Sequence, residues 1–166
     1  MYKVAITYNL KKKNTSTELP ADYFSEFDSP KTINAIKEAL ASEGNEVVLV
    51  EANMQLLEFF IKNKVDMVFN IAEGVNGMSR ESQVPAILDF IGIPYTGSDV
   101  LTLAVALDKA ATKKIFCHEN IPTPNFQLFK SADDKLSESL KFPLIIKPNC
   151  DGSAKGLSVT SVVRSP

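Results

Sequence analysis

The sequence is poor in the residues that build metal and redox centres. It has 166 residues, of which one is histidine and two are cysteine. Cys117 and Cys150 have neither metal-ligand nor redox-motif spacing, so a reducing, cytoplasmic compartment is the simplest interpretation. His118 lies among polar residues at the end of an expected helix. Because one histidine cannot form a histidine cluster, we expect it to be solvated rather than a ligand.

The chain also lacks an excess of either charge. Lys and Arg number 18 against 20 Asp and Glu, for a net charge of −2, which gives no reason to expect nucleic acid or an anionic membrane as a partner. The lysine run at 11–13 is short and indicates a solvated loop. No apolar run approaches the roughly 20 residues of a membrane helix. A strand-like pattern begins at Lys3, so we expect no signal peptide.

The first two thirds of the chain alternates strand and helix patterns. Strands are expected at residues 3–8, 46–50, 66–70 and 93–96, with helical stripes after each of them. This alternation predicts an α/β fold, with a parallel sheet and helices on both faces. Ligands of such sheets bind at the carboxyl ends of the strands. The polar segment 9–29 has no periodicity and is long for a loop, so we expect it to be functional, mobile or partly helical.

The pattern changes after about Ala106. Asp108 is expected to cap a helix that runs to about Glu119. A strand at 125–129, a helix at 131–140 capped by Ser131, and two further strands around a glycine-containing loop complete the chain. This order predicts a small α+β unit, and we divide the chain into domains 1–105 and 106–166.

A phosphate-binding pattern lies near the end of the sequence. The apolar run 142–146 is expected to be a buried strand, and Lys147 follows it, where its ammonium can meet a polyphosphate. The loop that follows contains Gly152 and Gly156. Glycines let backbone N–H groups approach phosphate oxygens closely. A dinucleotide-dependent oxidoreductase is disfavoured, because no Gly-x-Gly-x-x-Gly follows the first strand.

Four motifs in order resemble one family. They are Gly-Ile-Pro-Tyr-Thr-Gly-Ser at 92–98, Leu-Asp-Lys at 107–109, Ile-Pro-Thr-Pro at 121–124, and Ile-Ile-Lys-Pro at 145–148 with its Gly/Ser loop. Over residues 66–159 the chain closely resembles the D-alanine–D-alanine ligases and their relatives in the ATP-grasp superfamily. The resemblance implies a Rossmann-like pre-ATP-grasp domain that binds the first amino-acid substrate, followed by the beginning of the central ATP-grasp domain.

The resemblance also implies roles for single residues. Lys109 and Lys147 match the lysines that contact ATP phosphates. Gly152 and Gly156 lie in the matching lid over the triphosphate, and Ser153 matches a loop serine that orients the substrate-binding carboxylate and is the catalytic candidate. Each has a simpler alternative: Lys147 as a solvated lysine, Ser153 as a turn residue, and Lys109 as an ordinary lysine in the first turn of a helix, where the helix dipole disfavours it.

The substrate side departs from the family pattern. The family has a Gly-Gly-x-Ser-x-Glu type of turn after the first strand, whose glutamate holds the ammonium of the first D-alanine, and this chain has neither its glycines nor its glutamate. Glu73 stands where the family has histidine, and Glu81 falls near an acidic family position. Carboxylates there could hold an ammonium, and Arg80 could hold a carboxylate. The alternative for Arg80 and Glu81 is that they are solvated residues of a helix's first turn.

We therefore expect the N-terminal part of an ATP-dependent carboxylate–amine ligase with an acyl-phosphate mechanism. The resemblance implies ATP, Mg²⁺ and small amino-acid substrates, a role in peptidoglycan synthesis, and allows a homodimer. The family's Mg²⁺ ligands lie beyond residue 166, so no metal ligand is assigned and this chain alone is expected to be inactive. The alternatives are a ligase for another amino acid and a non-catalytic nucleotide-binding module.

Overall fold

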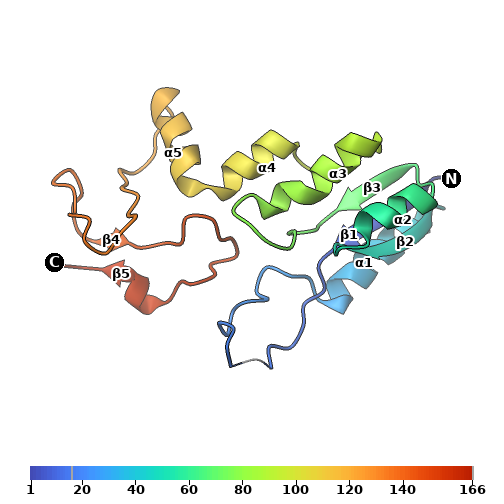
Figure 1. The fold of residues 1–166 in the computed structure, drawn as a ribbon, viewed down its shortest axis with the longest axis horizontal. Coiled ribbons are helices and arrows are strands. Elements are labelled where there is room, and N and C mark those ends of the chain that lie inside the picture. The colour runs from blue at the N-terminus through green and yellow to red at the C-terminus, as the bar shows by residue number, and fades with distance from the viewer. Residues whose placement is uncertain (16, 166) are drawn as a thin grey trace. The chain divides into compact units, whose positions relative to one another are not determined.

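The computed structural model describes residues 1–15 and 17–165 and divides into two compact units, Met1–Ala104 and the part from Val105 onward (Figure 1). The first unit contains β1 (Lys3–Tyr8), α1 (Pro30–Ser42), β2 (Glu46–Glu51), α2 (Leu56–Lys62), β3 (Met67–Asn70), the 3₁₀ helix η1 (Arg80–Ser82) and α3 (Gln83–Ile91). α4 (Val100–Leu107) contains the division. The second unit contains α5 (Lys109–His118), β4 (Leu144–Ile145), the 3₁₀ helix η2 (Val159–Ser161) and β5 (Val162–Val163).

The first unit is built on a parallel sheet with strand order β2-β1-β3. Val4 of β1 is in register with Val47 of β2 on one side and with Met67 of β3 on the other. The connections from β1 to β2 and from β2 to β3 each contain a helix, as crossovers between parallel strands of one sheet usually do. The α/β fold with a parallel sheet, expected from the alternating pattern, is confirmed.

Helices cover both faces of this sheet. Ala5 and Val68 belong to a buried cluster that includes Phe60 of α2 and Leu88 of α3, so these two helices cover one face. Side chains alternate across a strand, which places Ile6, itself fully buried, on the other face. There α1 contacts β1 and β2, and its one buried residue is Ile33.

Local signals determine where several helices begin and end. The Ser29 side chain accepts a hydrogen bond from the Thr32 N–H (3.1 Å), and Pro30 occupies the first turn of α1. This is the arrangement that the Ser-Pro pair predicts. Gly92 ends α3 in a left-handed conformation with φ +73°. That conformation costs glycine little because it has no Cβ.

One expectation for the first unit is wrong in detail. Residues 93–96 form no strand. Only a bridge joins Tyr95 to Val68, with hydrogen bonds from the Val68 N–H to Pro94 O and from the Thr96 N–H to Val68 O, both 2.9 Å. The expected helix after the second strand is present as α2, which buries Leu56 and Phe60 and leaves Ile61 71% exposed.

The second unit differs most from expectation. β4 and β5 pair antiparallel, but residues 125–129 form no strand and residues 131–140 form no helix. The Asp134 carboxylate accepts the N–H groups of Lys130 (2.7 Å) and Ser131 (3.2 Å), and the Gln127 side chain bonds the backbone of Lys135 and Ser137, each at 2.8 Å. These side-chain bonds offer the backbone an alternative to a helix, as Ser and Asp often do.

The scarce residues lie where the sequence predicts. His118 is the last residue of α5, and its side chain is 86% exposed. Neither Cys117 nor Cys150 takes part in a disulfide among the described residues. Within the part of the chain that the structure describes, no helix combines the length and the apolar character needed to cross a membrane.

The buried face of α3 should carry much of the first unit's stability. Leu88 is fully buried, whereas Phe90 on the same helix is 87% exposed. Leu88→Ala should lower the free energy of unfolding by about 2–5 kcal/mol, because it opens a cavity in the core. Phe90→Ala is the matched control and should change it little. Urea denaturation measures both, and equal effects would contradict this packing.

Candidate functional site

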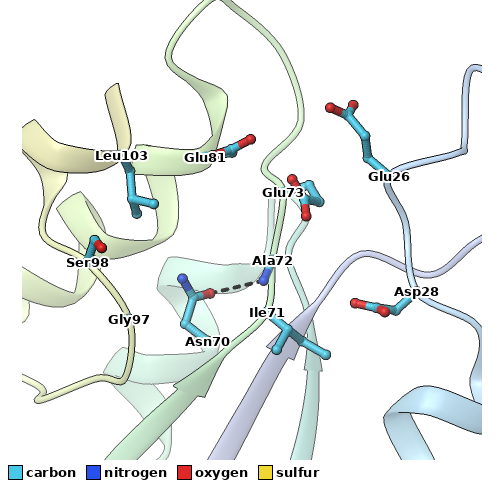
Figure 2. A pocket seen from close by; sticks show the side chains of 10 residues that line it. All are labelled: Glu26, Asp28, Asn70, Ile71, Ala72, Glu73, Glu81, Gly97, Ser98 and Leu103. Atoms are coloured by element: carbon cyan, nitrogen blue, oxygen red, sulfur yellow. Dashed lines mark hydrogen bonds between the residues drawn. The ribbon is translucent and has the colours of Figure 1, made fainter. Parts of the chain in front are cut away.

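A pocket of about 310 Å³ opens at the carboxyl ends of the strands in the first unit (Figure 2). It is where a doubly wound sheet is expected to bind its ligand. Segments that are far apart in the sequence contribute to it: the region between β1 and α1, the loop after β3, η1, and the turn before α4. The lining residues are Glu26, Asp28, Asn70, Ile71, Ala72, Glu73, Glu81, Gly97, Ser98 and Leu103.

The side chain of Asn9 joins the ends of the three strands. Asn9 follows β1 and is 5% exposed. Its Nδ2 donates to Ala52 O after β2 (3.0 Å), and its Oδ1 accepts the N–H groups of Glu73 (2.8 Å) and Gly74 (3.0 Å) after β3. Buried backbone groups need such partners. Asn9 therefore determines where the Glu73 backbone lies at the mouth of the pocket.

Asn70 organises the floor of the pocket in a similar way. Its Oδ1 accepts from the Thr7 hydroxyl (2.7 Å) and from the Ala72 N–H (3.2 Å), the second of which is drawn in Figure 2. Its backbone N–H donates to Thr96 Oγ1 (3.1 Å). The turn before α4 is thereby held against β3.

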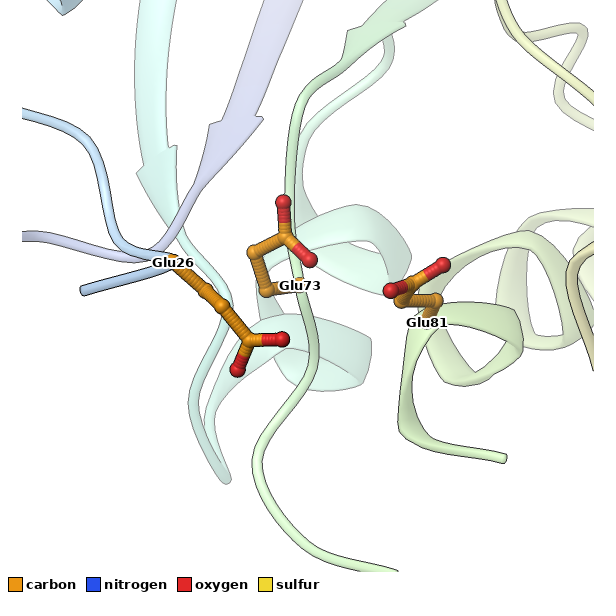
Figure 3. A group of neighbouring side chains, drawn as sticks. All are labelled: Glu26, Glu73 and Glu81. Carbon is orange, nitrogen blue, oxygen red and sulfur yellow. The ribbon is translucent and has the colours of Figure 1, made fainter. Parts of the chain in front are cut away.

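Three carboxylates meet at this pocket. Oxygens of Glu26, Glu73 and Glu81 lie within 4.8 Å of one another, and Figure 3 shows that each comes from a different segment. Arg80 Nη2 lies 2.6 Å from Glu26 Oε1, and these two side chains are 11% and 2% exposed. Because Arg80 already balances the charge of Glu26, this cluster is a poor match for a magnesium site, and we assign no metal to it.

Glu26 and Asp28 reach the pocket because the segment between β1 and α1 folds back on itself. Leu10 forms a bridge with Asp28, the Asp28 N–H donates to Asn9 O (3.0 Å), and the Lys11 N–H donates to Asp28 O (2.8 Å). A functional role is one of the three alternatives that the sequence leaves open for this long segment, but the sequence does not single out Glu26. The sequence signal that could have identified Glu26 is its position as an acidic residue among the aromatic residues of segment 23–27.

The pKa of Glu73 is raised from 4.5 to about 7. Burial is the largest cause, because it disfavours the charged carboxylate. The negative charges of Glu81 and Glu26 add to it, and Arg80 opposes them. Glu73 therefore exchanges a proton near neutral pH. Of the predicted substrate residues, Glu73 and Glu81 line the pocket, and Arg80 holds Glu26.

The second unit brings Lys109 to the start of the glycine-containing loop, residues 151–156, which we call the glycine loop. The Lys109 backbone N–H donates to Asn149 O at 3.1 Å. Its ammonium donates to Asn149 O at 3.4 Å and also to Asp151 O. Lys109 thus touches the backbone immediately before Gly152.

The glycine loop is a tight turn, exposed at Ser153, Ala154 and Gly156 and half-buried at its other residues. Ser153 and Ala154 have φ values of +47° and +56°, and Gly156 has +71°. The Lys155 N–H donates to Gly152 O (2.9 Å), and the Leu157 N–H donates to Ala154 O (3.0 Å). A Cβ on Gly156 would lie 2.9 Å from Pro148 Cγ, so glycine is needed there for the loop to close.

Lys147 is exposed and, within the described residues, its ammonium makes no hydrogen bond or ion pair. The expected buried strand before it is wrong. β4 contains only two residues and pairs with β5 alone among the described strands. Ile145 and Ile146 are consequently 54% and 65% exposed.

The raised pKa of Glu73 predicts a pH-dependent stability. Between about pH 4.5 and pH 7 the folded state keeps a proton that the unfolded state releases, so this residue makes stability fall as pH rises. Glu73→Gln cannot ionise and should melt at a higher temperature than the wild type at pH 8, with little difference at pH 4. Glu58→Gln, on an exposed part of α2, is the control. A difference in melting temperature between Glu73→Gln and the wild type that stays the same at all pH values would refute the raised pKa of Glu73.

Gly74 should not tolerate a side chain. A Cβ at this position would lie 2.0 Å from Arg80 O, whereas one on Gly77 would meet nothing within 4 Å. Both residues have positive φ, so both variants share the backbone strain of about 1 kcal/mol or more. Gly74→Ala should therefore destabilise the first unit more than Gly77→Ala does, as measured by urea denaturation. Equal losses would mean that the contact with η1 is unimportant.

D-alanine–D-alanine ligases are among the known proteins with similar sequences and folds. No protein-family model matches the chain. The ligase of Pseudomonas entomophila is 38% identical over 132 residues, which cover 78% of this chain and 41% of that protein. Two crystal structures of the Bacillus anthracis ligase are similar in fold. The structure with ATP has a TM-score of 0.64 and 27% sequence identity, and the match covers 90% of this chain and 48% of that chain. The second structure has a TM-score of 0.68 and 25% sequence identity, and the match covers 100% of this chain and 50% of that chain.

The chain spans about two fifths of the length of the curated relatives. Such partial coverage is consistent with the expected N-terminal portion. In sequence and in fold, the chain is similar to D-alanine–D-alanine ligases.

Proposed function

We propose that the protein to which this chain belongs is an ATP-dependent ligase that joins a carboxylate to an amine. A phosphoryl group from ATP would activate one substrate carboxylate as an acyl phosphate, with release of ADP. The amine of the second substrate would then attack the carbonyl carbon, and phosphate would leave as the amide bond forms. In this proposal Mg²⁺ accompanies ATP, and its protein ligands are not among the residues of this chain.

The observation that carries the proposal is the meeting of Lys109 with the glycine loop in a chain that is related to these ligases. A phosphoryl-transfer site needs positive charge and preorganised N–H donors where negative charge develops. Lys109 and Lys147 supply the charge, and the turn at Gly152, Ser153 and Gly156 supplies backbone donors. In this proposal Ser153 helps to orient the carboxylate that binds the substrate.

The acidic pocket of the first unit is proposed to hold an amino-acid substrate. Glu26, Glu73 and Glu81 surround one space, and an ammonium group is the substrate feature that carboxylates would bind. This chain lacks the glycines and the glutamate of the family's first turn, so D-alanine is one candidate among small amino acids. A homodimer and a cytoplasmic location belong to the same proposal.

Lys147 provides the sharpest test of ATP binding. Its side chain is exposed and, in the described part of the chain, bonds to no other group, so Lys147→Ala should leave the fold intact. It should weaken ATP binding on the order of tenfold in the full-length protein, since a bond to a charged group contributes about 1.5–3 kcal/mol. Isothermal titration calorimetry measures the affinity, and Lys130→Ala at another exposed position is the control. Unchanged affinity in the first variant would refute the assignment.

Phosphate release by the full-length protein tests the reaction itself. Release that requires ATP and a particular pair of amino acids is expected, and a panel of D- and L-amino-acid pairs would identify the substrates. ATP binding without release for any pair would favour the alternative of a non-catalytic nucleotide-binding module.

A further inference from the structure

We infer that Asn149 is a positioning residue that holds the glycine loop against the N-terminus of α5, so that the loop is ordered before a nucleotide arrives. The inference rests on the proposed function, because it concerns the same phosphate site. Sequence reasoning did not identify Asn149, which follows the expected phosphate lysine by only two positions.

Asn149 contacts α5 through both its side chain and its backbone. Its Oδ1 accepts the Ala110 N–H at 2.9 Å, and its Nδ2 donates to Asp108 Oδ1 at 2.8 Å. Its backbone oxygen accepts the Lys109 N–H at 3.1 Å. A single residue, 39 positions after Ala110 in the chain, therefore closes one end of the loop onto the first turn of the helix.

The first turn of α5 needs these acceptors. The first N–H groups of a helix have no partner within the helix. Asp108 caps one of them by accepting the Ala111 N–H at 2.9 Å, and Asn149 caps the preceding one, Ala110. The hydrogen bonds from Ala111 and Asn149 lower the pKa of Asp108, so its carboxylate stays ionised as the acceptor for the Asn149 amide.

Lys109 binds the same stretch from the other side. Its ammonium donates to the carbonyl oxygens of Asn149 and Asp151. An ammonium has three N–H donors, so one is left for a phosphate oxygen while the other two hold the loop. The Asn149 side chain thus places the carbonyl group that Lys109 binds, and it acts on the nucleotide only through Lys109 and the loop.

An ordered loop should increase nucleotide affinity. A mobile loop must lose conformational freedom when it closes on a ligand, and preorganisation removes part of this cost. If Asn149 only stabilised the fold, its replacement would lower the melting temperature and leave the affinity for ATP unchanged below that temperature. The two roles can therefore be separated by experiment.

Asn149→Asp is the most informative variant. It keeps an acceptor for the Ala110 N–H, removes the donor to Asp108 and places two carboxylates side by side. In the full-length protein at 20–25 °C, we expect the dissociation constant for ATP to rise on the order of tenfold. Amide hydrogen exchange over residues 150–156 should become faster. Asn125→Asp adds the same charge at an exposed position of the second unit and should change neither measurement.

The reversed pair provides a rescue. With Asp108→Asn added to Asn149→Asp, an amide faces a carboxylate again and the hydrogen bond can form with its direction reversed. Because Asp108 Oδ1 accepts both the Ala111 N–H and the Asn149 amide, the reversed bond forms at the expense of the Ala111 cap. The double variant should therefore recover part of the ATP affinity and of the slow exchange, since it no longer places two carboxylates side by side. If Asn149→Asp does not fold, Asn149→Ala replaces it, because it removes the side-chain bonds without adding charge.

The outcomes separate this inference from the proposed function. A wild-type protein that does not bind ATP would overturn the proposed function, and the exchange data would still decide whether Asn149 orders the loop. Binding of ATP by the wild type and by the Asn149 variant with equal affinity would overturn the positioning role alone. Loss of affinity in the single variant without recovery in the reversed pair would also contradict it.

Discussion

The pocket depends on one buried amide, that of Asn9. A parallel sheet places the ends of its strands at one edge, but it does not by itself order the loops that leave them. Asn9 does so by donating to the backbone after β2 and accepting two N–H groups after β3. Glu73 is thereby held in a partly buried position beside Glu26 and Glu81, and its raised pKa follows from that position.

In the second unit, side-chain oxygens likewise accept backbone N–H groups, here at a helix terminus. The side-chain oxygens of Asp108 and Asn149 satisfy N–H groups at the start of α5, and the second of these bonds ties a distant loop to the helix. In both units a side-chain amide joins backbone segments that are remote in the sequence. The candidate functional residues, Glu73 in one unit and Lys109 in the other, are adjacent to those amides.

Sequence reasoning succeeded where a short-range signal determines the structure. Ser29 with Pro30, Asp108 and Gly92 mark helix ends through bonds or backbone conformations that involve only near neighbours. It failed at residues 131–140, where Asp134 and Gln127 bond the backbone in place of a helix. It also missed Glu26, because the return of a long segment to the sheet edge is a tertiary effect that periodicity does not record.

Backbone amide shifts during an ATP titration of the isotopically labelled full-length protein test most directly whether the glycine loop and the start of α5 form the phosphate site. We expect the perturbed amides to concentrate at residues 109–111 and 149–156, while the shifts of those around the acidic pocket of the first unit stay unchanged. Saturable binding that perturbs only the acidic pocket, or no perturbation of the loop at millimolar ATP, would contradict it.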